Sequence, residues 1–312
     1  MSVKKFIFIL GLITLFVWGV NLTVTNGNIK LLSLVFIAFT LGLRHGFDAD
    51  HIVAIDNITR KLAFNNKQSF TTGLFFALGH STIVFILTLL IVAGVIQFKG
   101  SLGTVGDYGS IIGTSVSAIF LFLTGFMNLK SLFHGSPHSH THQFSAGIMT
   151  ILSRKIFNLV DRPLKMYLVG FLFGLGFDTA TEIALLGIAA SSALSGVSVW
   201  SILLLPLSFA SGMIIVDSFD SIFITNLYKQ FSNSNQRLLV YNKIMLISTA
   251  CLAFVVGFFE LAGLAAATNF RFAEIISKGS DFFDAHSEQI GMIIVLWCGL
   301  IWFLSRQSKG RM

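Results

Sequence analysis

Histidines and aspartates stand together in a stretch of this 312-residue chain that is apolar on both sides. Carboxylates alone suit Mg²⁺, Ca²⁺ or H⁺, whereas imidazole mixed with carboxylate suits a borderline transition metal such as Ni²⁺, Co²⁺ or Zn²⁺. No cluster of cysteines or methionines supplies the soft ligands that Cu⁺ prefers. The residue types therefore predict a site for a divalent transition-metal cation. The candidate ligands are His45, Asp48, Asp50, His51 and His80.

Further charged side chains stand inside apolar stretches. They are Arg44, Asp178, Glu182, Asp217, Asp220 and Glu260. An ionised group at the centre of a bilayer costs about 2.5–3.5 kcal/mol on insertion scales, so these groups must face one another, a cation or water. Arg44 can neutralise one or two acids, and the excess of carboxylates predicts a passage for a cation. The alternative for each acid outside the 44–52 stretch is that it fixes helix packing through hydrogen bonds.

The composition identifies the solvent around these groups. Hydrophobic residues make up 54% of the chain and charged residues only 11%, against about 25% in ordinary soluble domains. This excludes a cytosolic enzyme, a secreted disulfide scaffold and a disordered chain. No phosphate-binding loop of the G-x-x-x-x-G-K type is present, so neither ATP hydrolysis by the chain nor a cofactor is expected. We expect lipid and a metal ion as partners, and no nucleic acid.

Windows of about 20 mostly apolar residues predict eight membrane-spanning helices. They lie near 5–22, 31–58, 70–97, 110–133, 166–192, 198–227, 241–268 and 290–306. No small-residue cleavage site cleanly follows the first, so it is expected to be a retained helix rather than a signal peptide. The prediction is an all-α integral membrane protein that forms a single polytopic domain over residues 1–312. Asp56 and Asn57 close the second span next to Arg60, which predicts a role at a helix end or interface.

The basic residues set the orientation. With the N-terminus in the cytoplasm, sixteen Lys and Arg residues fall on the cytoplasmic side and four on the other. We therefore predict both termini inside a cytoplasmic membrane, which we expect to be bacterial. The longest polar loop, about 134–165, is then cytoplasmic, and it either buffers metal or is merely solvated. Its histidines are His134, His138, His140 and His142.

Helical spacing leaves the geometry of the first stretch open. At about 100° per residue, His45, Asp48 and His51 step around one face of a helix, whereas Asp50 points away. Either Asp50 has a supporting role, for example as an ion-pair partner of the neighbouring arginine, or the helix is unwound near Gly46. Broken helices at the membrane midplane are common where transporters bind ions.

Two stretches of the chain look alike. Gly46-Phe47-Asp48 and Gly176-Phe177-Asp178 are each followed within a turn by another acid. The spans that carry them run in opposite directions in the predicted topology. This pattern predicts an inverted repeat with the ion site at the interface between its halves.

The string Arg44-His45-Gly46-Phe47-Asp48-Ala49-Asp50-His51-Ile52 resembles the signature of the nickel/cobalt transporter (NiCoT) family, with His45, Asp50 and His51 on its H-x₄-D-H element. Residues 78–82, 175–182 and 212–220 look like its other signature blocks, in order. The resemblance implies an eight-helix permease of the cytoplasmic membrane that imports Ni²⁺ and, in some members, Co²⁺. It also implies that the H-x₄-D-H element is needed for transport. Related efflux proteins often carry a His-rich loop, so an exporter is the alternative.

The predicted mechanism is that Ni²⁺ sheds water into the site formed by the five candidate ligands, while Arg44, Asp178, Glu182, Asp217 and Asp220 support the path. Only neutral imidazole binds metal, so uptake should weaken at low pH. The membrane potential favours cation entry into the cell by about 2.3 kcal/mol per charge per 100 mV. An intramembrane protease would need a His-Glu-x-x-His element, which is absent, and a proton or sodium channel would not be expected to use paired histidines.

Overall fold

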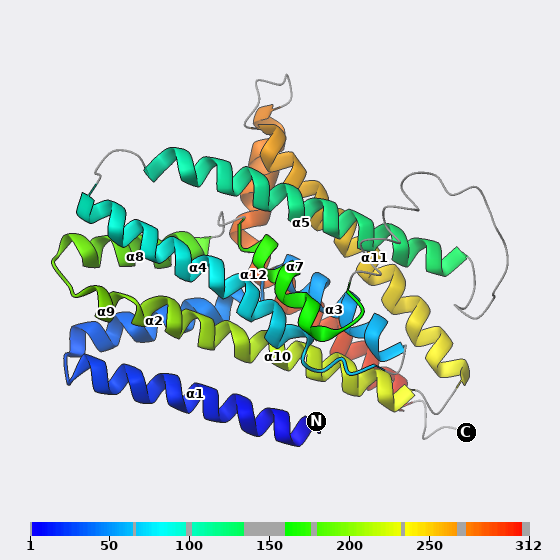
Figure 1. Ribbon diagram of the computed structural model, residues 1–312. Helices are drawn as coiled ribbons and strands as arrows, with labels where there is room; N and C mark the ends of the chain where they lie inside the picture. Colours follow the sequence, from blue (N-terminus) through cyan, green and yellow to red (C-terminus); the bar gives the residue numbers. More distant parts are fainter. Residues whose placement is uncertain are drawn as a thin grey trace.

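The computed structural model describes residues 2–64, 67–97, 102–133, 160–175, 180–231, 235–266 and 273–307. Every regular element in these ranges is a helix, as predicted (Figure 1). The helices are α1 (Val3–Thr25), α2 (Ile29–His45), α3 (Ala49–Phe64), α4 (Thr72–Gln97), α5 (Leu102–Phe133), α7 (Met166–Phe173), α8 (Ala180–Leu194), α9 (Val199–Ile202), α10 (Leu204–Phe231), α11 (Asn235–Ala266) and α12 (Ala273–Gln307). A 3₁₀ turn, η1 (Pro163–Lys165), precedes α7.

Several of these helices are long and apolar enough to cross a bilayer. Within the described residues, the four that pass on length and composition are Val3–Thr25, Thr72–Gly94, Val199–Leu227 and Leu246–Leu264. The pair α2 and α3 passes as a fifth if it counts as one span bent by 57°. Large apolar side chains point outward on α1, where Leu15 and Phe16 are each 70% exposed. Such a surface suits lipid rather than water, and the chain fits a multi-pass membrane protein.

The predicted spans and the observed helices differ most at three places. The second predicted span, 31–58, is two helices with a break, and the fifth, 166–192, is α7 followed by α8. The last span was placed at 290–306, but α12 begins at Ala273 and carries polar turns before its apolar half. Hydropathy windows detect the apolar part of a helix and miss its polar extension.

The break between α2 and α3 has a local cause. The N–H of Phe47 and the N–H of Asp48 donate to the carbonyls three residues earlier, both at 2.9 Å, which tightens the last turn of α2 and ends it. A side chain at Gly46 would crowd Val216, because a Cβ there would lie 2.7 Å from the Cβ of Val216. The glycine thus lets α10 approach the break closely.

Close backbone crossings hold the helices around the break together. A Cβ at Gly42 of α2 would collide with the carbonyl of Phe209 on α10. A Cβ at Gly170 of α7 would likewise collide with the carbonyl of Phe76 on α4. Both glycines belong to Gly-x-x-x-Gly pairs, which permit such contact.

The packing of α2–α3 and of α7–α8 follows one pattern. α2 packs on α10 as α7 packs on α4, α3 also packs on α10 as α8 packs on α4, and α4 packs directly against α10. α1 lies against α2 and α10, α5 packs along α11, and α12 packs against α11 and α3. The break of α2–α3 therefore lies in the middle of the molecule, between α4 and α10.

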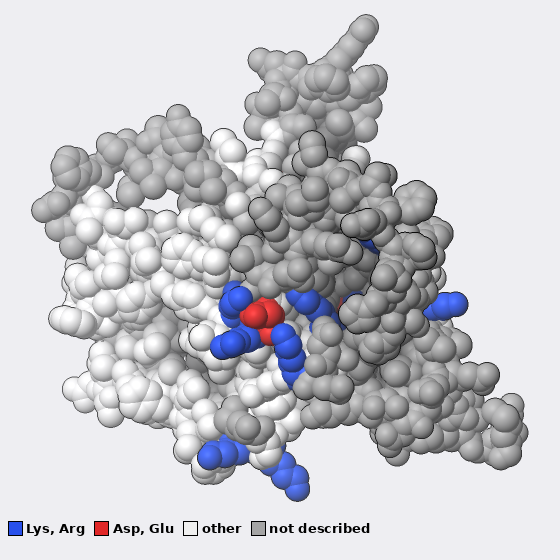
Figure 2. All heavy atoms as spheres, turned by 45° about the vertical axis from the view of Figure 1, so that its right-hand side comes forward, with Lys and Arg blue, Asp and Glu red and all other residues white. Residues whose placement is uncertain are grey.

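One end of the molecule is rich in basic side chains. α1 begins and α12 ends toward this end (Figure 1), and Figure 2 shows Lys and Arg gathered there around acidic atoms. Lys165 pairs with Asp161 at 2.8 Å, and Lys67 donates to the backbone carbonyl of Asp161 at 3.1 Å. The hydrogen bond from Lys165 lowers the pKa of Asp161, which lies outside the spans.

Candidate metal centre

Three buried imidazoles meet at the break between α2 and α3. His45 is the last residue of α2, His51 lies in the first turn of α3, and His80 comes from the first half of α4. One ring nitrogen of each lies within 4.8 Å of those of the other two. Each residue is at most 2% exposed. We call these three residues the His triad, and their nitrogen set fits a borderline transition-metal ion.

The break creates this geometry. His51 is six positions after His45, so in an unbroken helix the two rings would point about 120° apart. The 57° bend brings the ring centroids of His45 and His51 to 4.5 Å. Of the two alternatives that the spacing left open, the structure has the helix unwound near Gly46.

A carboxylate lies close to each member of the His triad, and the three carboxylates come from different parts of the chain. Asp48, in the break, places Oδ2 2.7 Å from Nδ1 of His45. Glu182 of α8 places Oε1 2.8 Å from Nε2 of His80, and this nitrogen is also 2.9 Å from Nε2 of His45. Carboxylates of this kind orient metal-binding imidazoles and balance the charge of a cation.

The third carboxylate belongs to Asp217 of α10, and its environment is different. Oδ1 of Asp217 lies 3.7 Å from Nδ1 of His51, beyond hydrogen-bond distance. Among the described residues, neither ring nitrogen of His51 and neither carboxylate oxygen of Asp217 has a hydrogen-bond partner, although both residues are fully buried. Buried polar atoms normally have partners, so this facing pair of unsatisfied groups fits a place where a cation binds.

Two residues of the signature string have roles at the edge of the site. Oδ1 of Asp50 accepts a hydrogen bond of 2.8 Å from the backbone N–H of His51, at the N-terminus of α3. Arg44 is 58% exposed at its side chain and pairs with Glu288 of α12, with Nε 2.7 Å from Oε2. This ion pair ties the end of α2 to α12.

Sequence reasoning missed the contribution of α12 to the site. The hydroxyl of Ser287 donates to Oδ1 of Asp48 at 2.6 Å, next to the Arg44–Glu288 pair. A Cβ at Gly291 would collide with the carbonyl of Phe47 in the break. Ser287, Glu288 and Gly291 share one face of α12, and the only signal was this small and polar spacing just before and at the start of the last predicted span.

A second buried polar group lies where α3 meets α5 and α11. Asp56 and Arg60 are 3% and 6% exposed and form an ion pair of 2.9 Å in the second half of α3. Arg60 also donates to Asn57 at 3.0 Å and to Thr249 of α11 at 2.6 Å, and Asn128 of α5 donates to Asn57 at 2.5 Å. We call these five residues the α3 polar cluster.

The remaining candidates fall in several places. Asp220 lies one turn beyond Asp217 on α10, is 3% exposed and is within electrostatic range of Asp56 and Arg60. Glu260 accepts a hydrogen bond of 2.8 Å from Ser117, between α11 and α5, as a packing role would require. Asp178 and the loop histidines His134, His138, His140 and His142 lie outside the described residues.

Comparison with known proteins explains why these polar groups are gathered inside apolar helices. Residues 31–307 match the family model NicO, described as high-affinity nickel-transport protein. The chain belongs to this nickel-transport family. The family is one of metal permeases rather than enzymes, as the sequence predicted, and the match covers α2 to α12 and thus the whole metal centre.

Curated relatives extend the nickel-transport family to several organisms. The high-affinity nickel transport protein of Cupriavidus necator is 34% identical over 92% of this chain and 86% of its own length. The hydrogenase nickel incorporation protein HupN of Bradyrhizobium diazoefficiens is 34% identical over 95% and 81%. The cobalt transport protein NhlF of Rhodococcus rhodochrous is 34% identical over 86% and 81%. No solved structure matches the chain.

Proposed function

We propose that this nickel-transport protein imports Ni²⁺ across a bacterial cytoplasmic membrane as a single eight-span domain over residues 1–312, with both termini in the cytoplasm. The observation that carries the proposal is the buried His triad, in which the ring nitrogens of His51 and the facing carboxylate of Asp217 have no hydrogen bonds among the described residues. If these side chains served only to pack the helices together, their buried polar atoms would be expected to form hydrogen bonds. The basic end of Figure 2 supports the orientation.

The chemistry assigns different parts to the ligands. The His triad binds the ion through neutral imidazole nitrogens. Asp48, Glu182 and Asp217 turn the rings and offset the charge of the cation. Asp50 holds the start of α3 in place for His51 and contributes negative charge. Arg44, with Glu288, holds the break against α12. Asp178 and Asp220 are proposed to support the path.

The packing pattern supports an inverted repeat. α2–α3 with α4 would form one half, and α7–α8 with α10 the other, because the contacts of α2–α3 on α10 mirror those of α7–α8 on α4. In such transporters the ion site lies at the interface of the halves, and access alternates when one half rocks against the other. The His triad, drawn from α2, α3 and α4, faces Glu182 of α8 and Asp217 of α10 across this interface.

Uptake of labelled Ni²⁺ into cells that express the chain tests the proposal, with Co²⁺, Zn²⁺ and Mn²⁺ as competitors. Competition by Co²⁺ is expected, since a relative is a cobalt transport protein. Expression should also lower the tolerance of cells to high Ni²⁺. A rise in tolerance would identify an exporter, the function that a His-rich cytoplasmic loop would suit, and would contradict import.

A further inference from the structure

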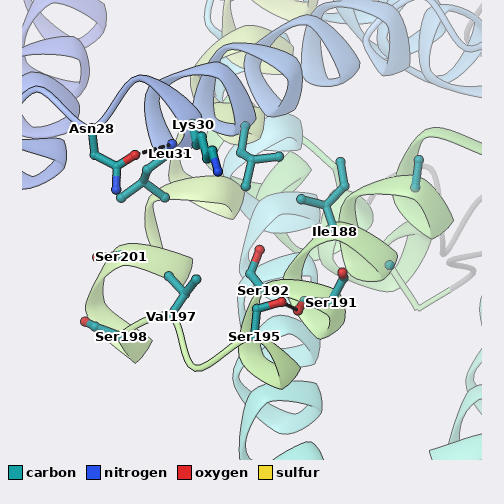
Figure 3. Close-up of a pocket in the computed structure, with 13 residues that line it drawn as sticks. Asn28, Lys30, Leu31, Ile188, Ser191, Ser192, Ser195, Val197, Ser198 and Ser201 are labelled. Atoms are coloured by element: carbon teal, nitrogen blue, oxygen red, sulfur yellow. Dashed lines mark hydrogen bonds between the residues drawn. The ribbon is translucent and has the colours of Figure 1, made fainter.

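A cleft opens at the end of the molecule opposite to the start of α1. It has a volume of about 770 Å³ and lies between the first turns of α2, the last turns of α8 and the start of α9 (Figure 3). Five serines line it, so we call it the serine cleft. They are Ser191, Ser192, Ser195, Ser198 and Ser201. In the proposed orientation this end faces away from the cytoplasm.

One hydroxyl in the serine cleft has no explained role in the fold. Ser192 is 7% exposed, and no hydrogen bond is found for its hydroxyl among the described residues. Figure 3 shows this hydroxyl directed from α8 toward the α2 side of the cleft. By contrast, the hydroxyl of Ser195 donates to the carbonyl of Ser191 at 2.9 Å. A hydroxyl of a mostly buried residue that opens onto a cleft without a protein partner is suited to bind water or a ligand.

The serine cleft leads toward the metal centre. Its lining follows one face of α8 from Ser195 down through Gly187 to Ala184. Ala184 is three residues, or about one turn, from Thr181, so the two share a face of α8. Thr181 in turn places its hydroxyl 3.2 Å from Nδ1 of His45 in the His triad. The same two helices that form the walls of the cleft, α2 and α8, therefore carry His45 and Thr181 at their inner ends.

We infer that the serine cleft is the outer vestibule of the transporter and binds the hydrated divalent cation before it reaches the His triad. The inference rests on the proposed function. Serine hydroxyls would accept hydrogen bonds from the water ligands of the ion, a mode of binding nearly as favourable as direct contact. Neutral hydroxyls hold a cation weakly enough for it to move on, as conduction requires. Loss of the water ligands then takes place at the imidazoles.

The first test fills the serine cleft without disturbing the protein. A Cβ at Gly187 meets no atom within 4 Å, so Gly187→Phe has room for its ring in the cleft. Gly19 of α1 has the same open surroundings outside the cleft, and Gly19→Phe is the matched control. We expect Gly187→Phe to lower the initial rate of Ni²⁺ uptake by about tenfold or more and Gly19→Phe to leave it unchanged.

Binding measurements separate this inference from the proposed function. Purified Gly187→Phe protein, equilibrated with Ni²⁺ in detergent, should bind the ion with unchanged stoichiometry, because the His triad is intact. His51→Ala protein should lose that binding. Normal uptake by Gly187→Phe would overturn the vestibule alone, whereas unchanged Ni²⁺ binding by His51→Ala would overturn the proposed function.

The second test uses the charge at the rim. Lys30 lines the opening of the serine cleft and is exposed, so it repels a cation weakly through solvent. Lys30→Glu should raise Ni²⁺ uptake a few-fold at low ionic strength, with Lys30→Gln in between, and salt should remove the difference. A fall in uptake would identify an anionic metal chelate as the occupant, and it would contradict a hydrated cation, as would an unchanged rate.

Discussion

His51 differs from the other two members of the His triad in what holds its ring. His45 and His80 have carboxylate oxygens within 2.8 Å, whereas the ring of His51 is held by edge-to-face packing on Phe76, with centroids 4.7 Å apart. Its nitrogens are therefore oriented by packing and remain free of hydrogen bonds within the described residues. A ring fixed in this way offers a nitrogen to a metal without first breaking a bond.

His51→Ala should abolish Ni²⁺ binding or weaken it by more than the about 10- to 100-fold that follows loss of an outer partner of a metal ligand. Without metal, the free energy of unfolding should change by less than about 2 kcal/mol, because removal of unsatisfied nitrogens offsets the cavity. Calorimetric titration with Ni²⁺ and thermal unfolding measure the two effects. His286→Ala, at an exposed histidine of α12, is the control and should bind normally.

Proton competition gives a second prediction at this scale. An ordinary imidazole takes up a proton near pH 6.5, and a protonated ring has no lone pair for a metal. Ni²⁺ affinity should therefore fall as pH is lowered from 7.5 to about 5.5, and binding should release protons at the lower pH. Titrations in buffers of different ionisation enthalpy detect the released protons. Affinity that stays constant over this range, in protein that remains folded, would argue against imidazole ligands.

At the scale of elements, α12 fixes the break that carries the site. Gly291 lets α12 touch the carbonyl of Phe47, and Gly291→Ala should push the two apart at a cost of about 1–3 kcal/mol. Both the melting temperature and Ni²⁺ affinity should fall, because Ser287 loses its reach to Asp48. Gly279→Ala, on the same helix, adds a Cβ in ordinary contact with Phe259 and should change neither. Equal effects of the two variants would remove α12 from the site.

The α3 polar cluster carries a prediction of its own. Arg60→Leu should destabilise the protein by about 3–5 kcal/mol, because it leaves Asp56 buried without its partner. The double variant Asp56→Leu/Arg60→Leu should recover much of that loss, since no charge stays buried. Lys165→Leu, which removes the equivalent partner from the exposed pair Asp161–Lys165, should alter the melting temperature little. A double variant as unstable as Arg60→Leu would show that packing, rather than charge, explains the loss.

The sequence predicted some of these elements and not others, for physical reasons. The residue types of the His triad were predicted because charged groups inside apolar stretches are costly and visible. The α2–α3 break was one of two alternatives, because the spacing of His45 and His51 does not determine the backbone conformation at Gly46. The burial of Asp56 and Arg60 was missed, because a hydropathy window ends where charges begin, even when those charges pair inside the protein.

At the scale of the whole molecule, α4 and α10 pack on each other, with α2–α3 on α10 and α7–α8 on α4. The contacts of α2 on α10 and of α7 on α4 therefore mirror each other. The apparent repeat in sequence, Gly46-Phe47-Asp48 and Gly176-Phe177-Asp178, was only three residues long, and residues 176–179 lie outside the described ranges. Evidence for the repeat therefore comes from packing rather than from sequence.

If the two halves are an inverted repeat, disrupting the same helix contact in either half should impair transport to a similar extent. Gly42→Ala forces α2 off the carbonyl of Phe209, and Gly170→Ala forces α7 off the carbonyl of Phe76. If the halves rock against each other through these two contacts, both variants should lose Ni²⁺ uptake to a similar extent, although Gly170 is far from the His triad in sequence. Gly11→Ala on α1, where a Cβ meets nothing within 4 Å, should transport normally. Loss of uptake in Gly42→Ala alone would mean that only α2–α3 moves during transport.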